Sequence, residues 1–356
     1  MAARAKSEIK LVVLEVIEAC NHACVHCYNY WRPRTTGDSD IARQASPLAR
    51  GPVLSRSEIL SLLKRVRRDT SVSWVAVSGG EPFVRKETPE IVSDLTREGF
   101  GVVIITNGTL ITEDRLRRLP DSASFEITLF SVYKERHDQI AGRESFQRLL
   151  RTFALLHKHK RHLVLGFVLS KLNAVDITRT IEMGVAVGAG AIMLNRVNLS
   201  RNVMPIASEL VPPLPMLREA LTAADDTAAK YGIPVVLSVP IPPCLADPKD
   251  YPHLQFGWCP RGGKEAYYTI GCTGLVRPCN HSSLVLGDLR RERFGAIIAS
   301  DQNRKFWAAA PVECQLCTHP LKDNCAGGCR AAAAECYGNP ARIDPYVDFT
   351  FAASRA

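Results

Sequence analysis

The sequence predicts an α/β protein built on parallel strands, followed by a small cysteine-rich region. Between residue 10 and about residue 240, β-rich apolar runs alternate with amphipathic stretches, an alternation that requires parallel strands joined by right-handed crossovers. No nucleotide-type glycine fingerprint follows the first strand, which favours a full or partial barrel over an open doubly wound sheet. Near residue 240 the composition changes to proline, glycine and cysteine. We therefore expect domains over residues 1–240 and 241–356.

The elements of the barrel can be assigned in order along the chain. Ser55 and Glu58 form a capping-box pattern that opens a helix reaching Arg68. Thr88-Pro89 marks the start of a second helix and Thr112 that of a third. Strands are predicted over 10–17, 72–77, 101–106, 124–130, 162–169, 191–197 and 233–239, and further helices over 146–158, after Asn173 and over about 214–231. A polar loop is expected over 32–53, where its length suggests a functional or mobile segment.

The composition fits a soluble globular protein, with 46% hydrophobic and 23% charged residues among 356. No apolar segment approaches the roughly 18–20 residues of a membrane span. Glu15 and Glu18 interrupt the apolar run before Cys20, so it does not form a signal-peptide core. The net charge of +9 comes from scattered basic residues without an aromatic stripe. We expect a cytoplasmic protein with neither a membrane nor a nucleic acid as partner.

The twelve cysteines fall into two groups, three between Cys20 and Cys27 and nine between Cys244 and Cys336. Disulfide frameworks belong mostly to small secreted domains, so metal ligation explains these groups better. The first group could hold zinc with His22 or His26 as the fourth ligand. Alternatively, three thiolates could hold a 4Fe–4S cluster with one open iron, at the carboxyl end of a barrel strand where such folds place their chemistry.

Two motifs carry a resemblance to a known family. Cys20-x3-Cys24-x2-Cys27, together with the turn Ser78-Gly79-Gly80-Glu81-Pro82, resembles the signature and the GGEP turn of the radical S-adenosylmethionine (SAM) superfamily. The resemblance implies a partial (β/α)6 TIM-like barrel and an open iron that chelates the amino and carboxylate groups of SAM. It also implies reductive cleavage of SAM to a 5'-deoxyadenosyl radical. Two glycines allow close backbone approach, and Glu81 is expected to accept a hydrogen bond from the SAM ammonium group.

The resemblance also implies further SAM-binding residues. His26 occupies the position where the family usually has an aromatic residue near the adenine, with a solvent-facing histidine as the alternative. Thr106 and Asn107 after the third strand, and Thr128 after the fourth, resemble SAM-lining positions, although they could also be simple strand ends. The expected cofactor-binding set is therefore His26, Gly79, Gly80, Glu81, Thr106, Asn107 and Thr128.

The C-terminal cysteines resemble the SPASM extension of radical SAM enzymes, which carries two auxiliary 4Fe–4S clusters. The resemblance assigns the ligands of the first auxiliary cluster as Cys259, Cys279 and Cys329, and those of the second as Cys314, Cys317 and Cys325. A zinc ribbon formed by Cys314, Cys317, Cys325 and Cys329 is the alternative.

Three departures from the SPASM pattern leave two ligands open. The spacing after Cys317 is x7 instead of x5, and the upstream ligand of the first cluster is missing, which leaves Cys244 or Cys272 as candidates. Cys272 is expected to be a packing thiol. Val347 stands where the last ligand is usual, so we expect Cys336 to replace it.

The resemblance implies an enzyme that modifies a peptide or protein side chain by cross-linking, epimerisation or oxidation. A small molecule or tetrapyrrole is the alternative substrate, and a non-enzymatic iron-sulfur carrier is disfavoured because the open-iron motif would have no task. A sulfatase-type maturase is also disfavoured, since Asn280 stands where such relatives have an aspartate base. The first strand begins near residue 10, so we expect no fused peptide-recognition domain. A peptide substrate would then need a separate recognition protein or direct recognition, a small molecule is the alternative partner, and a reductant such as flavodoxin or ferredoxin is also expected.

Overall fold

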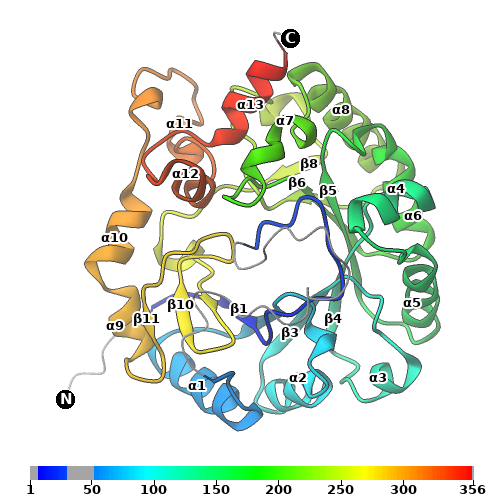
Figure 1. Cartoon of the computed structure of the whole chain (residues 1–356), viewed down its shortest axis with the longest axis vertical. Helices are drawn as coiled ribbons and strands as arrows, with labels where there is room; N and C mark the ends of the chain where they lie inside the picture. Colours follow the sequence, from blue (N-terminus) through cyan, green and yellow to red (C-terminus); the bar gives the residue numbers. More distant parts are fainter. Residues whose placement is uncertain (1–6, 30–51, 355–356) are drawn as a thin grey trace.

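The computed structural model describes residues 7–29 and 52–354, and the predicted loop over 32–53 lies outside this range except for its last two residues. At the centre of the protein lies one sheet, with the strand order β11-β10-β9-β1-β2-β3-β4-β5-β6-β7-β8 (Figure 1). The strands are β1 (Leu11–Glu15), β2 (Trp74–Ser78), β3 (Gly101–Thr106), β4 (Ser124–Thr128), β5 (Leu163–Leu169), β6 (Ala191–Arg196), β7 (Val235–Leu237), β8 (Leu254–Phe256), β9 (Thr269–Ile270), β10 (Leu275–Arg277) and β11 (Gly287–Asp288).

The helices lie on the outer side of this sheet and around the C-terminal region (Figure 1). They are α1 (Arg56–Asp69), α2 (Thr88–Arg97), α3 (Glu113–Arg117), α4 (Lys134–Ala141), α5 (Phe146–Lys158), α6 (Ile177–Ala186), α7 (Ala207–Leu210), α8 (Leu214–Tyr231), α9 (Phe294–Ile298), α10 (Asp301–Ala308), α11 (Lys322–Cys325), α12 (Arg330–Tyr337) and α13 (Pro345–Ala353). No helix in the described part of the chain has the length and apolar character needed to cross a membrane.

Six strand-helix units build the barrel. Strands β1 to β8 pair with their neighbours in parallel, and helices α1, α2, α3, α5, α6 and α8 follow the first six of these strands. This arrangement confirms the predicted partial (β/α)6 barrel. The sequence did not predict α4, which precedes α5 in the fourth crossover.

The pleat of the strands decides which side chains reach the barrel interior. In β3, β4 and β6, buried residues alternate with half-buried ones, as expected for strands whose side chains point alternately to the two faces of a sheet. The buried set, such as Ile104 and Ile127, packs in the main hydrophobic core. The other set includes Ile105, Thr128 and Asn195, which line a cavity inside the barrel.

The C-terminal region completes the sheet on the free side of β1. Strand β9 pairs with β1 in parallel, with Val13 opposite Thr269, and β10 adds an antiparallel strand. The carboxylate of Glu15, at the end of β1, forms a buried ion pair with Arg277 of β10. The cysteine-rich region is therefore anchored directly to the strand that precedes the first cysteine group.

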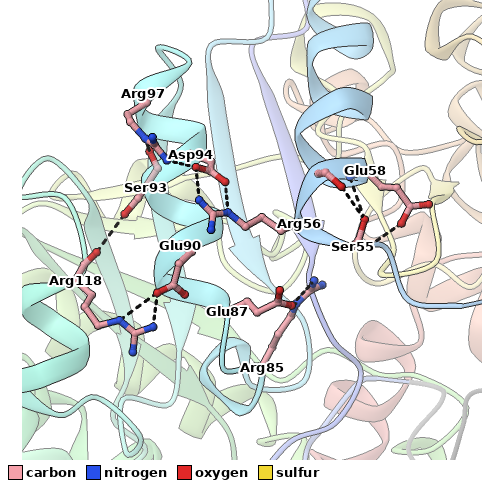
Figure 2. A network of polar contacts seen from close by, with 11 residues as sticks. Ser55, Arg56, Glu58, Arg85, Glu87, Glu90, Ser93, Asp94, Arg97 and Arg118 are labelled. Atoms are coloured by element: carbon pink, nitrogen blue, oxygen red, sulfur yellow. Dashed lines mark hydrogen bonds and ion pairs between the residues drawn. The ribbon is translucent and has the colours of Figure 1, made fainter.

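Polar contacts outside the sheet orient the first helices (Figure 2). Ser55 and Glu58 form the predicted capping box at the start of α1. Arg56 of α1 pairs with Asp94 of α2. Such partly exposed pairs contribute only about 0–1 kcal/mol each, so their main effect is to fix how the helices sit on the strands.

A second contact in the same region reaches toward the barrel interior. The guanidinium of Arg85 pairs with Glu87 at 3.0 Å (Figure 2) and also donates to the backbone carbonyl of Val16 at 3.2 Å. Val16 directly follows β1 and leads into the segment that contains Cys20. The segment after β2 thus holds the start of the cysteine segment in place.

Candidate functional site

A cavity of about 200 Å³ lies where the carboxyl ends of the strands meet. Cys20, Cys24 and Cys27 all line it. Six of the seven predicted cofactor-binding residues line it as well, namely His26, Gly79, Gly80, Thr106, Asn107 and Thr128. Residues from the ends of β2, β3 and β4 and from the cysteine segment are therefore brought to one place.

The cysteine segment is held by backbone hydrogen bonds on both sides of Cys24. The amides of Ala23 and Val25 donate to the carbonyls of Ala141 and Ile140, each at 3.0 Å. These two carbonyls belong to the last turn of α4. The helix that the sequence did not predict is thus the element that fixes the middle cysteine.

The turn after β2 needs glycine because it lies against the cysteine segment. The amide of Gly80 donates to the carbonyl of Ile17 at 2.9 Å. A Cβ atom on Gly79 would lie 2.1 Å from the oxygen of Ile17, and one on Gly80 would lie 2.2 Å from the oxygen of Glu18. Gly79 also has a φ of +145°, which L side chains rarely adopt. Any larger residue would push the two segments apart.

This close approach gives a first prediction. Gly79→Ala should displace the cysteine segment and reduce SAM cleavage at least tenfold, while the strands and helices still form. The matched control is Gly232→Ala, because Gly232 also has a positive φ, of +61°, yet a Cβ there would meet nothing within 4 Å. It should cost about 1 kcal/mol of stability and leave cleavage unchanged. Equal cleavage by both variants, measured as 5'-deoxyadenosine formed, would contradict the steric argument.

His26 offers a neutral ring to the cavity. Its ring packs edge-on against Phe130, with centroids 5.0 Å apart, and burial lowers the pKa of His26 to about 4. Its Nδ1 atom is buried and has no hydrogen-bond partner. The imidazole is thus uncharged at neutral pH and has one nitrogen available to a ligand.

The end of β3 is tied to the cysteine segment through side-chain amides. Asn107 donates from Nδ2 to Oδ1 of Asn21 at 2.8 Å, and Asn21 donates to the hydroxyl of Thr109 at 2.9 Å. Because Asn107 lines the cavity and Asn21 directly follows Cys20, this chain of amides sets the distance between one wall of the cavity and the first cysteine.

Glu81 makes extensive contacts within the protein, and the expected hydrogen bond from the SAM ammonium group stays a prediction. It is fully buried, and its carboxylate accepts from the Thr106 hydroxyl at 2.7 Å and from the backbone amides of Phe83 and Asn107 at 3.0 and 2.8 Å. These three bonds use both carboxylate oxygens. The side chain therefore links the turn after β2 to the end of β3, and the backbone of Gly79 and Gly80 faces the cavity in its place.

Three C-terminal cysteines form a second group. Cys259, Cys279 and Cys329 line one small enclosed cavity together with Tyr267, His281, Trp307 and other residues. Burial raises the pKa of Cys279 to about 12, and the neighbouring thiol of Cys259 adds to the rise. Three thiols that disfavour each other's ionisation are stable together as thiolates only when a positive charge binds between them.

Four cysteines form a third group, and one of them differs from the prediction. Burial raises the pKa of Cys244 to about 11, with further contributions from the thiols of Cys314 and Cys317. Burial also raises the pKa of Cys325 to about 12, and the thiols of Cys244 and Cys314 contribute to that rise. Cys244 thus lies with Cys314, Cys317 and Cys325 and away from the position expected for it beside Cys259.

Two contacts on either side of Cys244 hold it in this place. Asp247 pairs with Nε2 of His319 at 3.1 Å, and Pro242 packs so closely against Gly328 that a Cβ there would lie 3.1 Å from its ring. These contacts bring the segment before β8 onto the segment around α11, a long-range packing that cysteine spacing does not reveal.

The remaining two cysteines lie apart from this group. Cys336, expected beside Cys325, has Asp344, Glu335 and Arg196 as its electrostatic neighbours. It stands seven residues after Cys329, so its place along α12 directs it toward the Cys329 side. The buried thiol of Cys272 lies near Glu18 and Glu15, which agrees with a packing role.

Comparisons with known families match both parts of the chain. The family model described as the radical SAM superfamily matches residues 14–184, and the SPASM model, described as an iron-sulfur cluster-binding domain, matches residues 259–329. The chain belongs to the radical SAM superfamily. It is a radical SAM enzyme with a C-terminal SPASM domain, which confirms the family, the fold and the expected cofactors, namely SAM, a SAM-binding 4Fe–4S cluster and auxiliary clusters.

Two curated relatives are similar to this chain over nearly its whole length. The AdoMet-dependent heme synthase of Methanosarcina barkeri is 24% identical over 372 aligned positions, covering 95% of each chain. The PqqA peptide cyclase of Bradyrhizobium diazoefficiens is 23% identical, covering 94% of this chain and 84% of the relative.

Solved structures share the fold of this radical SAM enzyme. Streptococcus suis SuiB bound to the precursor peptide SuiA has a TM-score of 0.72 at 13% identity, covering 94% of this chain and 75% of SuiB. The enzyme anSMEcpe with bound AdoMet and Kp18Cys peptide has a TM-score of 0.70 at 17% identity, covering 95% of this chain and 94% of that protein.

The family matches favour iron-sulfur clusters over the two zinc alternatives. The SPASM model is described as an iron-sulfur cluster-binding domain, and the radical SAM model covers the segment with Cys20, Cys24 and Cys27. Thiolates are the ligands that such clusters require.

The main cavity also fits SAM. The backbone at Gly79 and Gly80 is open to close approach, and on the cavity wall the buried Nδ1 of His26 and Nδ2 of Asn198 have no hydrogen-bond partner among the residues that the structure describes. Asn198 is 5% exposed, and its Oδ1 accepts from Arg196, which leaves the amide hydrogens for a ligand. Asn198 was not predicted, since the sequence around it carries no motif.

Two further residues that the sequence did not identify lie between the main cavity and the Cys259 group. His281 lines both cavities. Its ring packs edge-on against Tyr28, with centroids 4.3 Å apart, and the Tyr28 hydroxyl accepts from Asn280 at 2.8 Å. Tyr28 directly follows Cys27, and His281 stands two residues after Cys279. In the sequence, the signal that could have identified Tyr28 and His281 is their proximity to these two cysteines.

A buried ion pair joins the main cavity to the Cys259 group by another path. Arg196, at the end of β6, pairs with Asp344, and both side chains are fully buried. Asp344 also accepts from the backbone amide of Cys329 at 2.8 Å, while the Arg196 guanidinium lies 4.3 Å from the centre of the Tyr346 ring. Hydrogen bonds around a cysteine ligand tune the metal that it binds.

Proposed function

We propose that this radical SAM enzyme abstracts a hydrogen atom from a peptide or protein side chain and oxidises, epimerises or cross-links it. The observation that carries the proposal is the position of His281, which lines both the main cavity and the cavity of Cys259, Cys279 and Cys329. A substrate in the main cavity is then within one residue of a second redox site, which suits a reaction that removes more than one electron.

In this proposal the three cysteine groups have separate tasks. Cys20, Cys24 and Cys27 hold the SAM-binding cluster. The first auxiliary cluster is held by Cys259, Cys279 and Cys329, and the second by Cys244, Cys314, Cys317 and Cys325. The SAM-binding cluster, when bound, supplies one electron that splits SAM into methionine and a 5'-deoxyadenosyl radical. This radical takes a hydrogen atom from a substrate carbon.

The protein residues bind, orient and shield. The neutral His26 ring and the free amide of Asn198 offer hydrogen bonds to the cofactor or the substrate. Phe130 and Val168 supply apolar walls that limit water near the reacting carbon. The buried polar contacts of Glu81 and Asn107 keep the strand ends at fixed positions, which a radical reaction needs because reacting atoms must stay close.

The size of the cavity favours a side chain over a whole ring system. Its volume is about 200 Å³ and has to accept part of SAM as well, whereas pockets that enclose a complete drug-sized molecule are usually about 300–1,000 Å³. A side chain inserted from an extended peptide fits this space, and the PqqA cyclase, SuiB and anSMEcpe are relatives whose names or structures involve peptides.

A tetrapyrrole remains the second candidate substrate. It is favoured by the similarity to the AdoMet-dependent heme synthase over 95% of both chains. A tetrapyrrole would have to present only its edge to the cavity. The cytoplasmic location, the reductant and a separate recognition protein stay predictions from the sequence.

The test of function uses deuterium transfer. The reconstituted enzyme is incubated anaerobically with SAM, a reductant and either perdeuterated synthetic peptides encoded beside its gene or a perdeuterated iron tetrapyrrole. We expect deuterium in 5'-deoxyadenosine, and a matching mass change, only with a peptide. Transfer from the tetrapyrrole alone would overturn the peptide proposal in favour of the second candidate, and no transfer from either would overturn both.

The ligand assignment gives a further prediction. Cys244→Ala should leave the second auxiliary cluster with three thiolates, so the iron content should fall below the value of about 12 per chain expected for three four-iron clusters. Cys272→Ala is the matched control, since Cys272 is a buried thiol outside all three groups, and it should keep full iron. Iron analysis and electron paramagnetic resonance (EPR) of the reduced protein measure this. Equal iron in both variants would remove Cys244 from the ligand set.

A further inference from the structure

The first auxiliary site lacks a fourth cysteine. Among the described residues that line its cavity, the cysteines are Cys259, Cys279 and Cys329. Cys244 lies with the other group, and Cys272 lies near Glu18 and Glu15. Cys336, on the Cys329 side of α12, does not line this cavity, so a fourth donor from the lining itself has to be a residue of another type.

Four other residues that line this cavity carry a side-chain nitrogen or oxygen, namely Ser238, Tyr267, His281 and Trp307. The indole of Trp307 has only a donor N–H and cannot ligate a metal in that form. The hydroxyls of Ser238 and Tyr267 would each have to lose a proton to become strong ligands. A neutral imidazole needs no such change and is the commonest nitrogen ligand in proteins.

The surroundings of His281 leave its ring free to ligate. Among the residues that the structure describes, its imidazole has a ring contact with Tyr28 and no side-chain hydrogen bond, and its backbone amide donates to the thiol of Cys279. His319, in the cysteine-rich region, is different. Its Nε2 pairs with Asp247 at 3.1 Å and its Nδ1 accepts from the amide of Leu321 at 3.1 Å. Both of its nitrogens are occupied.

We infer that His281 is the fourth ligand of the first auxiliary cluster. This rests on the proposed assignment of Cys259, Cys279 and Cys329 as the other three ligands. Because an imidazole is neutral where a thiolate is negative, the cluster carries one negative charge less than its all-cysteine equivalent. Histidine ligation raises the reduction potential of iron-sulfur centres, so this site accepts an electron more readily.

The position of His281 also gives the ligand a second contact. It lines the main cavity as well as the auxiliary one, so the imidazole connects the two sites directly. A substrate bound in the main cavity would therefore touch a ligand of the auxiliary cluster, and binding at one site would alter the spectrum of the other.

The test measures nitrogen coupling in the reduced auxiliary clusters. Protein with Cys20, Cys24 and Cys27 changed to alanine lacks the SAM-binding cluster, and labelling with 15N-histidine marks any imidazole ligand. Pulsed EPR should show a directly bound histidine nitrogen in this protein. The coupling should disappear on His281→Ala and persist on His319→Gln, the matched control. Coupling that is absent from the parent protein, or that survives His281→Ala, would overturn the inference.

A cysteine replacement separates ligation from packing. His281→Cys should keep the full iron of the auxiliary clusters, lose the nitrogen coupling and lower the reduction potential of one cluster, whereas a histidine that only packs would gain nothing from cysteine. Cys336→Ala tests Cys336 as the rival donor. If this variant changes the EPR spectrum of the first auxiliary cluster and His281→Ala does not, the fourth ligand is Cys336 and the inference is wrong. Cys259→Ala tests the underlying assignment: unchanged iron there would refute the ligand set itself, while loss of iron without any nitrogen coupling would refute only the role of His281.

Discussion

Replacing Cys20, Cys24 and Cys27 together by alanine is expected to abolish the formation of 5'-deoxyadenosine from SAM. All three thiols line the same cavity as Gly79 and Gly80, and no thiol of the C-terminal groups lines it. Without them the SAM-binding cluster has no ligands, so its iron, about four atoms per chain, should also be lost. Iron analysis should then give about 8 atoms in place of about 12.

The control for this experiment is Cys272→Ala, which removes a buried thiol outside the three groups. It should keep both full iron and normal SAM cleavage. Cleavage that continues in the triple variant would refute the assignment of the open-iron site. Iron near 4 instead of 8 would show that only one auxiliary cluster forms.

Asp344→Ala is expected to cause the largest loss of stability among single substitutions in the C-terminal region. It would leave the fully buried guanidinium of Arg196 without its carboxylate, and the backbone amides of Cys329 and Tyr346 without their acceptor. Removing one partner of a buried ion pair costs about 3–5 kcal/mol. The free energy of unfolding of the reconstituted enzyme, measured by urea titration, should fall by that amount.

Asp348→Ala is the matched control, because Asp348 is an exposed carboxylate on α13, the helix that Asp344 caps, and accepts from the Tyr337 hydroxyl as its one side-chain contact in the described part of the chain. Its effect should stay within about 0.5 kcal/mol. The double variant Arg196→Met with Asp344→Leu should recover much of the loss, since apolar residues often replace a buried pair without cost. An effect of Asp344→Ala as small as that of Asp348→Ala would show that the pair contributes little.

Local sequence patterns predicted the barrel well because each pattern reports on its own segment. The capping box at Ser55 gave the start of α1, and the apolar periodicity gave α5 and α8 with the bounds that the structure shows. The three-cysteine motif and the glycine turn were likewise readable, because close approach and metal ligation require particular residue types at fixed spacing.

The features that sequence reasoning missed depend on contacts between distant segments. Strands β9 and β10 are two and three residues long, too short for a periodic signal. The grouping of Cys244 with Cys314 depends on how the segment before β8 packs on α11. The contacts that Glu81 makes with Thr106 and Asn107 were also not predicted, because these residues lie more than twenty positions later in the chain.

The pairing of β1 with β9 sets a condition on how the chain folds during its synthesis. Strand β1 leaves the ribosome roughly 250 residues before one of its two neighbours, β9, whose Thr269 pairs with Val13. At roughly 5–20 residues per second this delay lasts on the order of tens of seconds. During that time β1 has an unpaired edge, which is the kind of surface that chaperones protect and that aggregates form on. Pairing of the β1 edge and completion of the C-terminal cluster sites are then late, linked events.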